Sequence, residues 1–208
     1  MMIFNCFDIL KRTIFFLFVV NLLIGCASTQ TNEGMQVNQS SDFVIRDDVD
    51  VRPEVKDDFE KAVRLLQEED YERGIRLLTR IVERSENSIA PYINLGIAYR
   101  KTGEMKQAED NLNKALALNA VHPSANNELA MVYRKTGRFS EARRIYERIL
   151  ERFPLFLPAR KNLGILCDLY INDLECAMAN YEIYNKADPG DKSMVMWIAD
   201  LRQRMENQ

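Results

Sequence analysis

This sequence has little of the chemistry that enzymes and metalloproteins use. Its 208 residues include a single histidine, His122, which falls in an expected loop just before Pro123. One loop histidine supplies neither a set of metal ligands nor a catalytic dyad. The sequence also lacks a phosphate-binding glycine loop, a nucleophile elbow and a spaced Cys/His pattern. We therefore predict that the protein is not an enzyme and uses no cofactor, metal or small-molecule substrate.

Glycine and proline, the helix-breaking residues, are also scarce, and the net charge is small. The chain contains 8 Gly and 6 Pro, which favours a largely helical protein. Its formal net charge is −3, and a charge this small predicts no nucleic-acid partner. Hydrophobic residues make up 47% of the chain and charged residues 28%, which are ordinary values for a globular fold.

The strongest positive signal is a pattern that occurs twice with an offset of 34 residues. Residues 95–103 read LGIAYRKTG, and residues 129–137 read LAMVYRKTG. Ala108 and Ala142 follow the two copies at the same offset. This period and these residues resemble the tetratricopeptide (TPR) family, whose unit is a helix–turn–helix of about 34 residues.

The resemblance implies an all-α fold, namely an α-solenoid of four TPR repeats at 53–191 followed by a capping helix at 192–208. The four repeats are 55–88, 89–122, 123–156 and 157–191. The second and third repeats match the family pattern well. The first and fourth are degenerate, as expected of units at the ends of a solenoid. Apolar residues at helical spacing give the capping segment one apolar face: Met194, Trp197, Ile198 and Leu201.

The first 25 residues form a different kind of segment. Lys11 and Arg12 precede an apolar run that ends at Leu23-Ile24-Gly25-Cys26. The run is long enough for a signal peptide but too short to span a bilayer. The tetrapeptide resembles the bacterial lipobox, which implies a signal peptide at 1–25 and a lipidated Cys26 that carries palmitate. Ala27 follows where inner-membrane lipoproteins carry aspartate, so the resemblance implies the periplasmic face of the outer membrane.

Residues 26–52 are expected to form the lipidated N-terminus and a flexible tether. They are rich in Ser, Thr, Gln, Asn and Asp, and this composition buries too little apolar surface to offset the entropy of ordering. The one apolar cluster among them is Phe43-Val44-Ile45. Either this cluster docks on the folded domain or on a partner, or it is solvated, and the sequence leaves these alternatives open.

Two of the four cysteines are candidates for a disulfide. Cys6 lies in the expected signal peptide and Cys26 is the expected lipid carrier, which leaves Cys167 and Cys176 on the two helices of the fourth repeat. A disulfide requires Cα atoms within about 7 Å, and hairpin geometry places Cys176 about one turn from the ideal partner position. A disulfide and two buried free thiols therefore remain alternatives.

The TPR resemblance implies that the first helix of each repeat lines a concave groove. The predicted groove residues are Phe59 and Val63 in repeat one, Ile93, Asn94, Ile97, Arg100 and Lys101 in repeat two, Asn127, Met131, Arg134 and Lys135 in repeat three, and Lys161 and Ile165 in repeat four. An apolar floor with a basic edge suits an extended or helical peptide that carries acidic groups. Alternatively, the two Arg-Lys pairs only complement helix dipoles.

These features predict a non-catalytic scaffold for protein–protein interaction that is lipid-anchored in the bacterial envelope. The expected partner is a protein or peptide of the envelope, and the membrane is contacted through the lipid. TPR lipoproteins of similar design act as pilotins for type IV pilus secretins or accompany TonB-type energy transducers, so support of such a machine is expected. The alternative is an adaptor that recruits peptidoglycan hydrolases or proteases. The sequence specifies neither the partner nor the oligomeric state.

Overall fold

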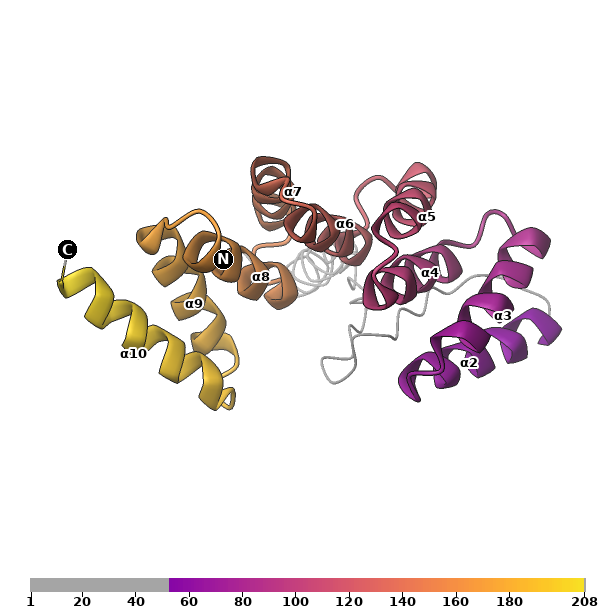
Figure 1. The fold of residues 1–208 in the computed structure, drawn as a ribbon, viewed down its shortest axis with the longest axis horizontal. Helices are drawn as coiled ribbons and strands as arrows, with labels where there is room; N and C mark the ends of the chain where they lie inside the picture. Colours follow the sequence, from indigo (N-terminus) through magenta and orange to yellow (C-terminus); the bar gives the residue numbers. More distant parts are fainter. Residues whose placement is uncertain (1–52, 208) are drawn as a thin grey trace, which may run out of the picture. The chain divides into compact units, whose positions relative to one another are not determined.

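The computed structural model describes residues 53–207, and within that range every regular element is an α-helix. The helices are α2 (Pro53–Gln67), α3 (Tyr71–Arg84), α4 (Ile89–Thr102), α5 (Met105–Leu118), α6 (Pro123–Lys135), α7 (Phe139–Arg152), α8 (Leu157–Leu169), α9 (Leu174–Ala187) and α10 (Lys192–Glu206) (Figure 1). The predicted signal peptide, Cys26, the tether and Phe43-Val44-Ile45 lie outside the described residues. Of the helices in this range, none has both the length and the apolar character needed to cross a membrane.

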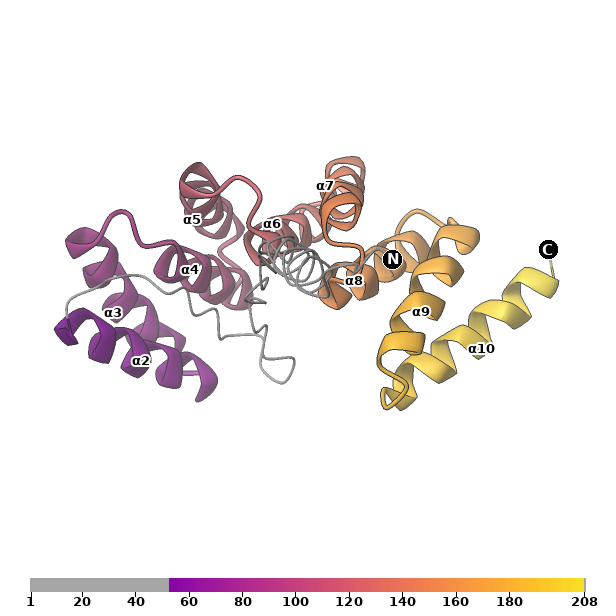
Figure 2. The ribbon, with the colours of Figure 1, turned by 180° about the vertical axis from the view of Figure 1, so that it is seen from behind.

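Consecutive helices pair into hairpins, and the hairpins follow one another in chain order. The pairs are α2 with α3, α4 with α5, α6 with α7 and α8 with α9, and both ribbon views show them side by side (Figures 1 and 2). The first helices of the hairpins, α2, α4, α6 and α8, also contact one another in sequence, and we name them the A helices. The helix α10 packs against α9. The predicted all-α helical repeat fold is confirmed.

Left-handed backbone conformations occur where all four hairpins turn, and Glu69 takes φ 60° in the turn of the first hairpin. Gly103 and Gly137 have φ angles of 91° and 79°, and Asn172 takes φ 54° in the longer turn of the fourth hairpin. The repeated Arg-Lys-Thr-Gly motif predicts the two glycines, since only glycine enters this region without a steric penalty. Asn172 replaces glycine because asparagine tolerates the left-handed region better than most residues.

Close helix contacts explain two further glycines. A Cβ added to Gly96 would lie 2.5 Å from Leu112 Cγ, and one added to Gly164 would lie 2.4 Å from Tyr181 Cε1. Leu112 and Tyr181 are fully buried side chains of the partner helix in the same hairpin. The small residue on the A helix thus makes room for a large side chain from the second helix.

Capping side chains fix where several helices begin. Asp70, Asp173 and Asp191 accept hydrogen bonds from backbone N–H groups in the first turns of α3, α9 and α10. His122 does the same for α6, because its Nδ1 accepts from the N–H of Ala125 at 3.3 Å. The single histidine of the chain is therefore a structural cap, buried at the start of α6.

Candidate functional site

The predicted groove residues all lie on the A helices, which contact one another across the described repeats. Phe59 and Val63 are on α2, Ile93 to Lys101 are on α4, Asn127 to Lys135 are on α6, and Lys161 and Ile165 are on α8. We call this set the A-helix face. Whether it binds a peptide stays a prediction, but the structure defines how its charged and polar groups are used.

Exposure divides the A-helix face into three groups. Buried residues are Val63, Ile93, Asn94, Ile97, Arg100 and Asn127. Partly buried residues are Phe59, Met131, Arg134, Lys161 and Ile165. Lys101 and Lys135, at the ends of α4 and α6, are exposed. The basic edge expected from the two Arg-Lys pairs is therefore exposed mainly at its lysines.

Arg100 is engaged in an ion pair between repeats. Its Nε donates to Glu128 Oε2 on α6 at 2.8 Å, and the two side chains are 5% and 11% exposed. Both groups are withdrawn from water, so the pair fixes α4 against α6 rather than offering a charge to a partner. The prediction of Arg100 as a groove residue places it on the correct helix, but its charge is satisfied inside the stack.

Arg134 occupies the equivalent position one repeat later and has different neighbours. Its guanidinium lies 5.5 Å from the centre of the Tyr170 ring, and its Nε is buried without a hydrogen-bond partner. No carboxylate in 53–207 forms an ion pair with Arg134 or Lys135. The hydroxyl of Tyr146 is also buried without a partner, and burial raises the pKa of this phenol. Arg134 is thus a partly buried cation that forms no ion pair within residues 53–207.

Two asparagines add hydrogen-bonding groups to the same face. Asn94 Nδ2 donates to the Ala90 carbonyl at 2.9 Å, while its Oδ1 is buried without a donor. Asn127 Oδ1 accepts from Asn162 Nδ2 at 3.1 Å, which links α6 to α8. Asn94 is 0% exposed, so its unpaired oxygen lies inside the stack and is not accessible to a binding partner.

Lys161 belongs to a cluster at the last repeat. Its Nζ lies 2.8 Å from Asp191 Oδ2, and it also lies above the rings of Tyr184 and Trp197, at 5.2 and 5.5 Å from their centres. Hydrogen bonds from Lys161 and then from Ser193 hold the pKa of Asp191 well below its usual range. The charge of Lys161 is therefore matched within the fourth repeat and the start of α10.

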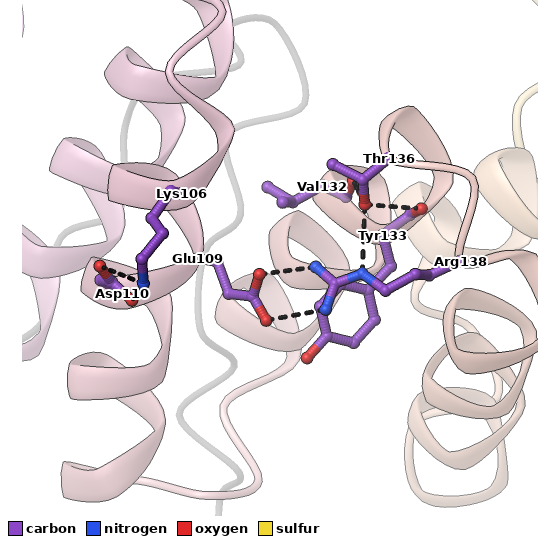
Figure 3. A network of polar contacts seen from close by, with 7 residues as sticks. All are labelled: Lys106, Glu109, Asp110, Val132, Tyr133, Thr136 and Arg138. Carbon is purple, nitrogen blue, oxygen red and sulfur yellow. Dashed lines mark hydrogen bonds and ion pairs between the residues drawn. The ribbon is translucent and has the colours of Figure 1, made fainter.

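A second inter-repeat pair lies on the α5–α7 side of the stack (Figure 3). Arg138 donates from Nη1 and Nη2 to both oxygens of Glu109, at 3.0 and 2.6 Å, and its guanidinium carbon lies 3.8 Å from the centre of the Tyr133 ring. Its Nε donates to Thr136 Oγ1 at 3.2 Å. The hydrogen bonds from Arg138 lower the pKa of Glu109. Bidentate geometry and ring stacking make this a rigid clamp between consecutive repeats.

Cys167 and Cys176 are joined by a disulfide across the fourth hairpin, with Cα atoms 5.9 Å apart. The sequence left this bond and two free thiols as alternatives. The Asp173 carboxylate lies close enough to both sulfurs for the three to be considered as metal ligands. However, Asp173 accepts from the Cys176 N–H at 3.0 Å and pairs with Arg143 Nη1 at 2.9 Å, and bonded sulfurs supply no thiolate ligand. The cluster therefore acts as a structural lock on the hairpin.

Sequence reasoning did not identify the partners of these charges. The structure pairs Glu128 with Arg100 of α4, and Asp168 with Arg204 of α10. One signal was available, because Arg100, Arg134 and Asp168 recur at intervals of 34 residues and so occupy equivalent positions. A position that changes from Arg to Asp within a repeat array indicates a different partner in the last repeat.

The fold and these contacts define an all-α helical repeat protein whose charged groups tie successive hairpins together. Residues 93–155, from α4 to just past α7, match the family model described as Tetratricopeptide repeat. TPR domains bind protein partners. In sequence, the chain is 33% identical over 86 residues to Cilia- and flagella-associated protein 70 of Homo sapiens. That alignment covers 41% of this chain and 8% of the relative, so the chain spans less than a tenth of that protein.

Solved structures share the fold over most of the chain. MamA residues 41 to the end from Desulfovibrio magneticus RS-1 superimposes with a TM-score of 0.64 at 21% identity, covering 74% of this chain and 87% of that one. PilF of Pseudomonas aeruginosa gives a TM-score of 0.67 at 19% identity, with coverages of 74% and 69%. At such identities the similarity establishes the helical repeat fold.

Proposed function

We propose that this chain is a non-catalytic scaffold that binds a protein partner through its A-helix face and is held in the bacterial envelope by a lipid on Cys26. It would support the assembly or function of a membrane machine such as a secretin/pilus or TonB-type system. The observation that carries the binding role is the basic edge at the end of α6. Arg134 is partly buried and Lys135 is exposed, and within residues 53–207 neither forms an ion pair.

A segment of a protein partner would neutralise this edge. A carboxylate on it could accept from the accessible part of the Arg134 guanidinium and approach Lys135. This is the chemistry of an extended or helical peptide that carries acidic side chains. The lipid anchor is supported by the sequence Leu23-Ile24-Gly25-Cys26. One acyl chain gives marginal membrane binding and two or three give stable binding, so a lipidated Cys26 would hold the scaffold at the membrane.

The binding role is tested by crosslinking in intact cells, comparing the wild type with Arg134→Ala/Lys135→Ala. Arg80→Ala/Arg144→Ala is the matched control, because these exposed arginines lie on α3 and α7 rather than on an A helix. We expect recovery of secretin or TonB-system components, reduced in the first double variant and unchanged in the control. Recovery of peptidoglycan hydrolases or proteases would support the adaptor instead, and equal recovery from both variants would rule out the basic edge.

Arg100 is left out of this test because its substitution breaks the buried pair with Glu128. The anchor is tested separately with Cys26→Ser, which should move the protein from the membrane fraction to the soluble fraction and abolish incorporation of labelled palmitate. Retention of the serine variant in the membrane would contradict the lipoprotein proposal.

A further inference from the structure

We propose that a pocket between α8, α9 and α10 is the anchor subsite of the partner-binding face, and that it takes one large apolar side chain of a partner segment that carries carboxylates close by. This inference rests on the proposed function and specifies what the partner must present. Two independent observations carry it. One is an open apolar pocket whose own charges are already paired, and the other is an unmatched cation beside its rim.

The pocket has a volume of about 430 Å³. Its apolar lining comes from Ile165 and Leu169 of α8, Tyr181 of α9 and Trp197 of α10. Pockets that hold small ligands measure about 300–1,000 Å³, so this one has room for a large side chain and little more. Ile165 is also one of the A-helix residues, which makes the pocket continuous with the A-helix face.

The polar groups in the pocket are paired with one another. Arg204 of α10 donates from Nη2 to Asp168 and from Nε to Asp200, the second at 3.0 Å. Tyr181 Oη donates to the other oxygen of Asp168 at 3.3 Å. Because Arg204 already engages both carboxylates, the charged side chains that line the pocket are matched with one another. An apolar occupant therefore fits it best, since apolar burial needs no polar partner.

The rim of the pocket exposes large apolar surface. Leu169, the last residue of α8, is 68% exposed, and Tyr170, which follows the helix, is 45% exposed, whereas the other large apolar residues of α8 are buried or partly buried. They protrude because the fourth hairpin has the longer turn at residues 170–173, in which Tyr170 no longer takes part in α8. Exposed apolar side chains around a pocket are typical of an interaction site.

The unmatched charge lies beside this rim. Arg134 of α6 is placed over the Tyr170 ring, and Phe139 contacts the same ring with centres 5.2 Å apart. Within the described part of the chain, neither Arg134 nor Lys135 forms an ion pair. A carboxylate next to the apolar anchor would neutralise the basic edge formed by Arg134 and Lys135. Charge complementarity thus identifies the occupant as an acidic segment of a protein with one aliphatic or aromatic anchor.

The chain contains a built-in reporter for this site, because its one tryptophan, Trp197, lines the pocket. The experiment titrates full-length protein with synthetic peptides that hold a single Phe and two Asp residues at increasing separations in a Ser/Ala background. Trp197 fluorescence reports on the pocket, and the anisotropy of a dye on the peptide reports on binding anywhere. We expect a saturable change in Trp197 fluorescence for at least one spacing.

Matched variants separate the contribution of the apolar anchor to binding from that of the carboxylates. Replacing the peptide Phe by Ser should weaken binding about tenfold or more, as loss of an anchor residue does. Replacing both Asp residues of the peptide by Asn, or making Arg134→Gln in the protein, should weaken binding by a smaller factor. Either change should also make the affinity less dependent on salt concentration. Leu169→Lys should abolish the fluorescence change. Leu155→Lys is the control, since Leu155 is 75% exposed in the α7–α8 loop and does not line the pocket.

One set of results would contradict the anchor subsite alone, and a further result would also contradict the proposed function. If the peptides change anisotropy but neither Trp197 fluorescence nor the Leu169→Lys variant responds, they bind elsewhere. The anchor subsite is then wrong while the scaffold proposal stands. If no peptide of the set changes either signal, the inference is wrong. If, in addition, the Arg134→Ala/Lys135→Ala variant loses no partner in cells, the A-helix face is not the binding site.

Discussion

Arg100 of α4 and Glu128 of α6 form a nearly buried ion pair between consecutive repeats, with an Nε–Oε2 distance of 2.8 Å. The two residues come from different hairpins and meet only because α4 and α6 pack side by side. A buried pair of this kind contributes little net stability compared with apolar residues, but removing one partner leaves a charge stranded away from water. The charge of Arg100 is therefore used inside the stack, whereas Lys135 on the same A-helix face is exposed.

The first prediction concerns this pair. Arg100→Ala should lower the free energy of unfolding by about 3–5 kcal/mol, because Glu128 would remain buried and lose this partner. The double variant Arg100→Met/Glu128→Leu should lose much less stability than the sum of the losses caused by Arg100→Met and by Glu128→Leu, since it leaves no charge unpaired. Urea denaturation of the wild type, both single variants and the double variant measures the coupling. Additive losses would show that the two side chains do not act as a unit.

The second prediction tests the close approach at Gly164. Gly164→Ala should lower the free energy of unfolding by about 1–3 kcal/mol, because the new Cβ would overlap the buried Tyr181 ring. The same substitution at an open helical position would raise stability by up to about 1 kcal/mol. Gly190→Ala is the control, since the nearest atom to an added Cβ there is 3.5 Å away, and its effect should stay within about 0.5 kcal/mol. A stabilised Gly164→Ala variant would contradict the packing described here.

The third prediction concerns the disulfide of the fourth hairpin. No Lys or Arg lies between Lys161 and Lys186, so trypsin releases both Cys167 and Cys176 in one peptide. Without a reducing agent, this peptide should resist alkylation and have a mass lower by two hydrogens. Cys176→Ser, or reduction, should lower the free energy of unfolding by about 2–4 kcal/mol because the cross-link restricts the unfolded chain. Full alkylation of the untreated, denatured protein would show that the thiols are free.

The fourth prediction is a dependence of stability on pH. The folded-state pKa of Asp191 is depressed by the hydrogen bonds from Lys161 and Ser193, whereas an unfolded aspartate has a pKa of about 3.9. The ionised carboxylate therefore adds stability that is complete above about pH 4 and is lost as the pH falls further, toward the folded-state pKa. Asp191→Asn should be less stable than the wild type at pH 7, and the difference should narrow below about pH 4.

Asparagine suits this comparison because it caps a helix about as well as aspartate, so the substitution removes mainly the charge. Urea midpoints measured at a series of pH values from neutral to strongly acidic give the difference directly. A constant difference at every pH would show that Asp191 stabilises the protein through something other than its ionised carboxylate.

The sequence alone determined the helices, the hairpin turns and the repeat arrangement. Local rules suffice for these features, since the turns at Gly103 and Gly137 depend on residues close in sequence, and the 34-residue period is read directly from the repeated motif. It also placed the candidate groove residues on the correct helices. This placement follows from the resemblance to the TPR family, in which the first helix of each repeat lines the groove. Whether these residues bind a peptide stays a prediction.

Only the tertiary structure decided what those residues do. Arg100 and Arg134 occupy equivalent positions in nearly identical motifs, yet Arg100 is neutralised by Glu128 while Arg134 forms no ion pair with a carboxylate of residues 53–207. The difference arises in the next repeat, where the residue equivalent to Glu128 is Asn162. The pocket beside Trp197 likewise exists only because α8, α9 and α10 meet. Such features depend on contacts between repeats that are distant in sequence, so no local pattern specifies them.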